Sequence, residues 1–265
     1  SGETTGDNSV AIGSHALQNQ NNTSNLDAYN VGVGYNAGYA VTTGTSNTLI
    51  GGLSGDAITT GNQNVSVGTN SLSTLTTGSY NTAVGNRALL YLETGSFATA
   101  VGQDALLNST SGLNTAVGYS AMYSNTSGDY NVAVGHTALG LNTTGTQNVA
   151  VGYQAGNANT TASYNTFLGT FSGSNNTTGA NNTAVGNYAL SLNTTGQRNT
   201  AIGRAALYSN TTGQYNTALG YDALSANTTA ENNTAVGYLA LTANTTGTRN
   251  VAVGTYALDT ASTGN

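Results

Sequence analysis

Apolar and polar positions recur along this chain with a fixed spacing. The clearest copy of the repeat occupies residues 182–198 and reads Asn-Thr-Ala-Val-Gly-Asn-Tyr-Ala-Leu-Ser-Leu-Asn-Thr-Thr-Gly-Gln-Arg. Its first glycine recurs fifteen times, at Gly13, Gly34, Gly51, Gly68, Gly85, Gly102, Gly118, Gly135, Gly152, Gly169, Gly186, Gly203, Gly220, Gly237 and Gly254. Consecutive copies are 17 residues apart, with two exceptions. Because a fixed period with one structural unit per copy is typical of stacked repeat proteins, we predict a single repeat domain over residues 1–265, part of a longer chain.

The alternation inside each copy predicts β-structure. In a short strand, Thr183 and Val185 would lie on one face and Ala184 on the other. We predict a second strand over residues 188–192 and a chain reversal at 193–196, where Asn and Gly adopt positive φ. Glycines and Asn-Thr clusters disfavour helix, and two short strands per copy make one coil of a solenoid. The predicted fold is therefore all-β, a parallel β-solenoid (β-roll) of about fifteen 17-residue coils.

Positions that correspond in successive copies form columns along the stack. The Val185 column contains only Val, Ile or Leu, and the Leu190 column contains Leu or Met in all but four copies. Because these side chains are those most often buried, we predict that both columns lie in the core. The predicted structural core includes Leu190, Leu207, Val134, Val151, Val185, Ile202 and Leu219.

Four glycines interrupt the Leu190 column and indicate which columns share an interior. They are Gly38, Gly55, Gly156 and Gly173. In two of these copies the small residue of the Ala184 column is enlarged, to Leu49 and to Phe167. A large side chain that enters where another shrinks conserves the volume of a close-packed interior. We therefore predict that the Ala184 and Leu190 columns pack against each other.

The other face of the same strand is also apolar. The Thr183 column contains only Thr or Val, and the Val185 column contains only aliphatic residues. A strand that is apolar on both faces is buried on both, and a single thin coil provides an interior for one face only. We predict that the second face is buried by association with other copies of the chain, as a homotrimeric rod.

Two segments carry a resemblance to known repeat proteins. Residues 8–13 (Asn-Ser-Val-Ala-Ile-Gly) and 199–203 (Asn-Thr-Ala-Ile-Gly) resemble the head repeats of trimeric autotransporter adhesins. That resemblance implies a trimeric, left-handed parallel β-roll on a bacterial surface, with shorter coils in which Asn-Thr-Thr-Gly would be an insertion. The longer pattern, which adds Ala-Leu and Asn-Thr-Thr-Gly, is similar to repeats of phage and virus tail-fibre proteins. Both imply an extracellular protein, on a virion tail fibre or a cell surface.

Composition and charge narrow the set of partners. Charged residues make up 5% of the chain, the net charge is −6 and the cations are four Arg, so no basic patch predicts nucleic-acid binding. No apolar run approaches the ~20 residues of a membrane span, and cysteine is absent. We expect the partners to be the chain itself, as a homotrimer, and a glycan or protein receptor on a host surface. Neither nucleic acid nor membrane insertion is expected.

No constellation of residues predicts catalysis. His15 and His136 are far apart in the stack, and the ten acids are scattered over different positions of the repeat. Catalysis requires convergent polar groups, and calcium-binding solenoids require a ladder of Asp that this chain lacks. We therefore predict no catalytic, cofactor-binding or metal-binding residues, no cofactor and no enzyme activity. In a trimer, carboxylates from different chains could meet, so polysaccharide depolymerase activity is kept as an alternative.

Tyrosines gather in two columns that flank the strand. The column just after the glycine contains Tyr35, Tyr119, Tyr153, Tyr221 and Tyr238, and a second column lies just before the strand. Because both columns are otherwise polar, we predict surface rings that shield neighbouring coils. The first column is also a candidate for contact with a glycan or another surface, by stacking on sugar rings.

Eight Asn-Thr-Thr or Asn-Thr-Ser segments at one shared position of the repeat match the N-glycosylation pattern. Their asparagines are Asn125, Asn142, Asn159, Asn176, Asn193, Asn210, Asn227 and Asn244. Because these residues occupy the predicted chain reversal, we favour turn formation and stacked asparagine ladders and keep glycosylation as the alternative.

These observations favour a structural and adhesive protein, the shaft of a trimeric viral or phage tail fibre that supports receptor attachment. The main alternative is a bacterial surface adhesin of the trimeric autotransporter type. A self-assembling surface filament and an ice-binding solenoid are further alternatives, the latter because threonine recurs in columns.

Overall fold

The computed structural model describes residues 8–21 and 27–260. The chain is an all-β parallel β-solenoid with about 14 turns of about 17 residues, which confirms the predicted fold class. It comprises two compact units, Ser1–Asp129 and Tyr130–Asn265, each built from the same coil. Within the described ranges there is no helix that could cross a membrane.

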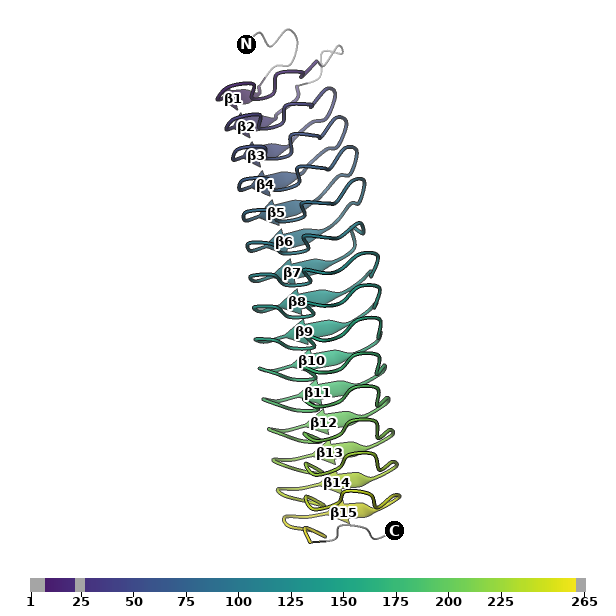
Figure 1. The fold of residues 1–265 in the computed structure, drawn as a ribbon. Helices are drawn as coiled ribbons and strands as arrows, with labels where there is room; N and C mark the ends of the chain where they lie inside the picture. The colour runs from purple at the N-terminus through teal and green to yellow at the C-terminus, as the bar shows by residue number, and fades with distance from the viewer. Residues whose placement is uncertain (1–7, 22–26, 261–265) are drawn as a thin grey trace. The chain divides into compact units, whose positions relative to one another are not determined.

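Each coil contributes one strand of three residues (Figure 1). The first unit contains β1 (Val10–Ile12), β2 (Val31–Val33), β3 (Thr48–Ile50), β4 (Val65–Val67), β5 (Thr82–Val84), β6 (Thr99–Val101) and β7 (Thr115–Val117). The second unit contains β8 (Val132–Val134), β9 (Val149–Val151), β10 (Thr166–Leu168), β11 (Thr183–Val185), β12 (Thr200–Ile202), β13 (Thr217–Leu219), β14 (Thr234–Val236) and β15 (Val251–Val253).

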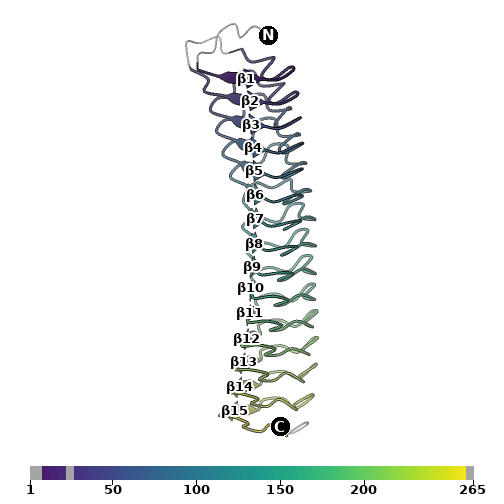
Figure 2. The same cartoon turned by 90° about the vertical axis from the view of Figure 1, so that its left-hand side faces the viewer.

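Consecutive strands within each unit pair in parallel and in register. Thr183 faces Thr200, for example, and the next two residues of β11 face the next two of β12. Figure 2 shows that the strands of a unit follow one side of the coils, with the turns on the other side. Because the register repeats without a slip, each column of the sequence is also a column in space.

Each strand separates an interior face from an outer face, as its alternation predicts. In β11, Ala184 is fully buried, whereas Thr183 and Val185 are only partly buried on the outer face. Leu190 and Leu207, two of the predicted core residues, are fully buried. The interior of each coil is therefore filled from the Ala184 and Leu190 columns.

In the single chain the Val185 column lies on the outer face, opposite Ala184, and its burial in a core between associated chains stays a prediction. Val151, Ile202 and Leu219 are 39, 37 and 44% exposed, and Val134 and Val185 are also partly exposed. The physical reason is the thickness of the coil. Small alanines and one leucine per turn already fill the interior, so the remaining strand side chains point outward.

Residues 188–192 do not form the predicted second strand. They are a run of turns in which Tyr188 (φ 59°) and Leu190 (φ 54°) adopt left-handed backbone conformations. The amide of Leu190 donates to the carbonyl of Ala206 in the next coil, at 2.9 Å, and the amide of Ala189 donates to the carbonyl of Gly186 in its own coil, at 3.2 Å. Successive amides thus alternate between partners in neighbouring coils and in their own coil, which an extended strand would not allow.

Positive φ does not fall at the predicted chain reversal, 193–196. Neither Asn193 nor Gly196 adopts it, whereas Arg198, two residues further on, does (φ 55°). The left-handed backbone of residues such as Leu190 and Arg198 disfavours L-amino acids with a Cβ by roughly 1–2 kcal/mol each. Hydrogen bonds between coils and burial of the leucine offset this cost.

The glycine after each strand makes a close approach to the next coil. Gly186 has φ 133°, and a Cβ on it would lie 2.5 Å from the carbonyl oxygen of Gly203 in the next coil. Neither the backbone conformation nor the space accepts another residue, which explains why every copy has glycine here.

The predicted compensation between columns is present in the interior. A Cβ on Gly173 would lie 2.3 Å from the ring of Phe167, and a Cβ on Gly156 would lie 2.5 Å from the same ring. Leu49 occupies the space of two leucines in the same way, against Gly38 and Gly55. Each enlarged side chain therefore spans two coils, and both neighbouring glycines are required.

Two ladders of buried asparagine close the coils of the second unit. In the first ladder, the backbone amide of Asn182 donates to Asn165 Oδ1 at 2.9 Å, and its Nδ2 donates to the carbonyl of Gly196 at 2.8 Å. In the second, Asn193 Nδ2 donates to Asn176 Oδ1 at 2.7 Å and to the same Gly196 carbonyl at 3.0 Å. One carbonyl thus receives both asparagines, which ties the turn to the start of the strand.

The second ladder has an apolar counterpart in the first unit. At the position of Asn193, four coils of the first unit have Val41, Ile58, Leu75 and Leu92, all fully buried. Leucine and asparagine have similar shapes, so either can fill this space. An asparagine, however, adds hydrogen bonds that continue from coil to coil.

The ladders also bear on the glycosylation pattern. The eight asparagines of the Asn-Thr-Thr and Asn-Thr-Ser segments are fully buried. Their Nδ2 atoms, where a glycan would be attached, donate hydrogen bonds inside the coil, as at Asn159 and Asn210. The folded chain therefore offers no access to these sites, and the structural interpretation of the motif is the one that fits.

We predict that Phe167→Ala lowers the free energy of unfolding of the second unit by about 3–5 kcal/mol, because it leaves a cavity across two coils. The triple variant Phe167→Ala, Gly156→Leu, Gly173→Leu restores the common pattern of the repeat and should regain most of this loss. Denaturant unfolding followed by circular dichroism measures both. Gly173→Leu alone should be strongly destabilising, and a triple variant no more stable than Phe167→Ala would contradict the shared interior.

We predict that Asn193→Asp destabilises the second unit by about 3–5 kcal/mol at neutral pH, because a buried carboxylate cannot donate to Asn176 Oδ1 or to the Gly196 carbonyl. Asn187→Asp is the matched control. Asn187 is exposed and donates only to the Thr170 carbonyl, at 3.2 Å, so its loss should cost about 1 kcal/mol or less. Similar thermal midpoints for the two variants would show that the interior ladder contributes little.

Candidate functional site: an aromatic edge

The five tyrosines predicted to contact a glycan or another surface lie in one column at the turn after each strand. Tyr35, Tyr119, Tyr153, Tyr221 and Tyr238 are 40–58% exposed. The column begins directly after the glycine that approaches the next coil, so the rings are positioned by backbone that cannot shift. Tyr35 and Tyr119 lie in the first unit and the other three in the second.

In the second unit, rings from this column and from two neighbouring positions contact one another along the coils. We call this surface the aromatic edge. It consists of His136, Tyr153, Phe171, Tyr188, Tyr208, Tyr221, Tyr238 and Tyr256. Neighbouring ring centroids are 5.0–6.2 Å apart, within the range of favourable aromatic pairs.

The structure brings only two of the five predicted tyrosines together. Tyr221 and Tyr238 stack with centroids 5.3 Å apart, whereas Tyr153 contacts Phe171 at 5.2 Å. The pKa of Tyr238 is raised above its ordinary value, chiefly because the adjacent Tyr256 would carry a like charge. The aromatic edge therefore depends on residues that the sequence prediction did not include.

Those missed residues were visible as a second aromatic position. Phe171, Tyr188 and Tyr256 all lie one position further along the repeat than the predicted tyrosines. Two positions at adjacent columns contribute to one edge because the backbone turns tightly there. Column membership alone does not indicate this.

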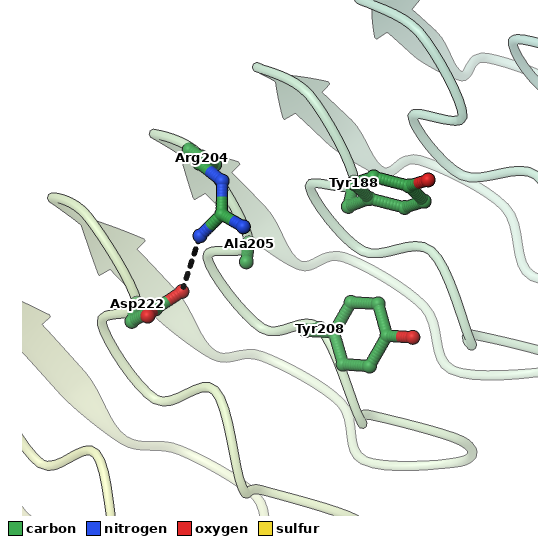
Figure 3. A pocket seen from close by; sticks show the side chains of 5 residues that line it. All are labelled: Tyr188, Arg204, Ala205, Tyr208 and Asp222. Carbon is green, nitrogen blue, oxygen red and sulfur yellow. Dashed lines mark ion pairs between the residues drawn. The ribbon is translucent and has the colours of Figure 1, made fainter.

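The aromatic edge is interrupted by an open depression, which we call the Ala205 slot (Figure 3). It is lined by Tyr188, Arg204, Ala205, Tyr208 and Asp222 and has a volume of about 390 Å³. Figure 3 shows the Ala205 methyl group between Tyr188 and Asp222, with the Tyr208 ring at one side.

The charged side chains of the slot are held in place by the next ring. Arg204 Nη1 donates to the hydroxyl of Tyr221 at 2.7 Å, and its guanidinium lies 5.0 Å from the centre of that ring. The same nitrogen is 3.7 Å from Asp222 Oδ1. This separation is an ion pair but is longer than a direct hydrogen bond.

A second aromatic column lies on the other side of the strand, as predicted. Tyr80 stacks on Phe97 with centroids 5.2 Å apart, and Arg198 covers Tyr215 at 5.3 Å. Phe97 also lines a shallow depression of about 500 Å³ in the first unit, together with Ser96, Thr110, Ser111, Gly112, Leu113, Ser127 and Asp129.

Among the described residues, no group of three or more His, Cys, Asp or Glu side chains could hold a metal ion. In the first unit, Arg87 donates from Nε and Nη2 to the two carboxylate oxygens of Asp104, at 2.8 Å each, and Asp104 is nearly buried. This bidentate pair links two adjacent coils. His15 and His136 contact tyrosine rings.

No protein-family model matches this chain, and no curated protein is significantly similar to it. The assignment of the fold therefore depends on the structure, and the resemblances noted in the sequence support a proposal of function only.

We predict a pH-dependent contribution of Asp56 to the stability of the first unit. Burial raises the pKa of this carboxyl group, and Asp56 Oδ1 is buried without a hydrogen-bond partner in the part of the chain that the structure describes. Because a raised pKa in the folded state penalises the ionised form, the contribution of Asp56 to stability falls as pH rises above the ordinary carboxyl pKa of about 3.9.

The measurement is thermal unfolding of Asp56→Asn and the wild type as a function of pH. Asp56→Asn should be the more stable protein at pH 7, and the difference should disappear below a pH of about 3.9. Asp129→Asn, in the same unit, is the comparison for a general loss of charge. A constant difference at all pH values would assign the effect to packing and not to ionisation.

Proposed function

We propose that the chain is a structural and adhesive protein, a shaft segment of a trimeric extracellular fibre of the kind that attaches a virus or phage to its host. Such a segment acts mechanically, since it holds a receptor-binding part at a distance from the particle. The resemblance to tail-fibre repeats favours this assignment, and a bacterial surface adhesin of the trimeric autotransporter type is the alternative with the same physical basis.

The outer face of the sheet carries this proposal. In every strand the two outward side chains are Thr or Val and then Val, Ile or Leu. Exposed fractions of 37% at Ile202 and 44% at Leu219 are high for aliphatic side chains on a regular sheet. A contiguous apolar face of this kind is typical of a surface that another protein covers. Because the face repeats with the coils, a partner with the same repeat is the simplest match.

The interior supports a stiff element. Every coil is tied to the next by strand pairing, by bonds from the turns, as from Leu190 to Ala206, and by the Asn182 ladder. Bending would have to stretch several of these rows at once. A stack of this type resists bending without any helix or disulfide.

One observation supports the ice-binding alternative. Thr166, Thr183, Thr200, Thr217 and Thr234 occupy the same outer position in five consecutive strands, from β10 to β14. This row would be covered in a trimer and exposed in a monomer. Thermal hysteresis of a purified monomer would favour ice binding. If no thermal hysteresis is measured, the ice-binding alternative is excluded.

We predict that light scattering of the purified chain gives a mass near three times 26.5 kDa. The double variant Ile202→Glu, Leu219→Glu should give the mass of one chain, because it places charges in a face where each aliphatic side chain contributes about 1.5–3 kcal/mol of burial. Thr195→Glu, at an exposed position away from the outer face, is the matched control and should remain trimeric. A folded wild-type monomer at all concentrations would overturn the proposal.

A further inference from the structure

We propose that the Ala205 slot binds the ring of a neutral pyranose sugar. This inference goes beyond a mechanical role for the chain and does not depend on it. It assigns a ligand site to one position on the aromatic edge of the second unit.

The slot lies where a run of two stacked aromatic side chains ends. Phe171 and Tyr188 occupy the same position in consecutive coils and stack with centroids 5.0 Å apart and planes 10° apart. The next coil has Ala205 at this position, and the one after it has Asp222. Consecutive coils are about 4.8 Å apart, so the vacant position has about the thickness of one stacked ring.

The walls of the slot suit a flat ligand with an apolar face. Phe171 covers one face of Tyr188, and the Tyr188 side chain lines the slot. Tyr208 stands edge-on to Tyr188, with planes 74° apart and centroids 6.2 Å apart, and closes one side. A pyranose presents an apolar face of C–H groups, whose partial positive charge is attracted to the negative face of an aromatic ring.

The polar end of the slot suits adjacent hydroxyl groups. Asp222 and Arg204 lie 3.7 Å apart, and no hydrogen bond to the Asp222 carboxylate is present among the described residues. Arg204 lies over the Tyr221 ring and donates to its hydroxyl from Nη1, and a guanidinium has further N–H groups that can donate to a ligand. One sugar hydroxyl can donate to Asp222 while its neighbour accepts from Arg204, and hydrogen bonds to charged groups are the stronger kind.

The charges of the slot favour a neutral sugar. The carboxylate of Asp222 would repel an acidic sugar, and the guanidinium of Arg204 would repel a basic one, whereas the two together are neutral. A purely aromatic ligand would stack on Tyr188 but would cover both charged groups without a partner, which is costly. A sugar ring with an apolar face and vicinal hydroxyls can contact the aromatic rings, Asp222 and Arg204 at the same time.

The size of the slot agrees with one sugar ring. A volume of about 390 Å³ is at the lower end of the range for small-molecule sites. Because the slot is open to solvent, the dissociation constant for a single sugar should be on the order of 1 mM. Contact with several residues of a polysaccharide would raise the apparent affinity.

The test is saturation-transfer NMR on the full chain with a panel of neutral methyl pyranosides, with N-acetylneuraminic acid and with phenol. Each probe is used up to about 50 mM, well above the expected dissociation constant. We expect at least one neutral pyranoside to receive saturation. Ala205→Phe should weaken that signal at least about tenfold, because the added ring fills the slot. The substitution should be tolerated, since Phe171 has the same backbone conformation (φ 57°) as Ala205 (φ 53°).

Controls separate the slot from the rest of the edge. Thr137→Phe adds a ring at the corresponding position of another coil and should leave binding unchanged. Asp222→Asn should weaken binding without loss of fold, which thermal unfolding verifies. The proposal is overturned if no neutral pyranoside binds, if binding survives Ala205→Phe, or if N-acetylneuraminic acid or phenol binds in preference. None of these outcomes depends on whether the chain is trimeric.

Discussion

The close approach of one coil to the next is the constraint on which the rest of this structure depends. The glycine after each strand lies against the carbonyl of the next glycine, as Gly186 does against Gly203. No side chain fits there, so every coil must repeat the same path at the same height. Three features follow from this superposition of coils. They are the strand register, the left-handed backbone at Tyr188 and Leu190, and the alignment of the columns.

The interior shows how a thin stack remains close-packed. Each coil has space for alanines, one leucine and two asparagines, and the asparagines are acceptable because the Gly196 carbonyl and the neighbouring ladder members satisfy them. Where Phe167 enters, two leucines are replaced by glycine. The unit of packing is therefore a pair of coils, since a side chain too large for one coil is accommodated by its neighbour as well.

The repeat itself and the departures from it have different roles. Regular columns produce stacking and an apolar outer face, which suit a mechanical element that associates with copies of itself. A change of residue within a column, such as Tyr188 followed by Ala205, produces a local shape, here the Ala205 slot. In a molecule whose surface is otherwise periodic, a ligand can be recognised at one height only where the period is broken.

The sequence by itself determined the coil length, the parallel stacking, the inward direction of Ala184 and the pairing of Phe167 with glycine. Each of these depends on a spacing or a volume, which a list of residues contains. Only the tertiary structure decided that residues 188–192 are turns, because the sign of φ at Tyr188 and Leu190 is not encoded in their hydrophobicity. It also decided that Val185 faces outward from a filled interior and that Gly196 receives both asparagines. The Ala205 slot combines side chains from three coils and three columns, and only the folded backbone brings them together.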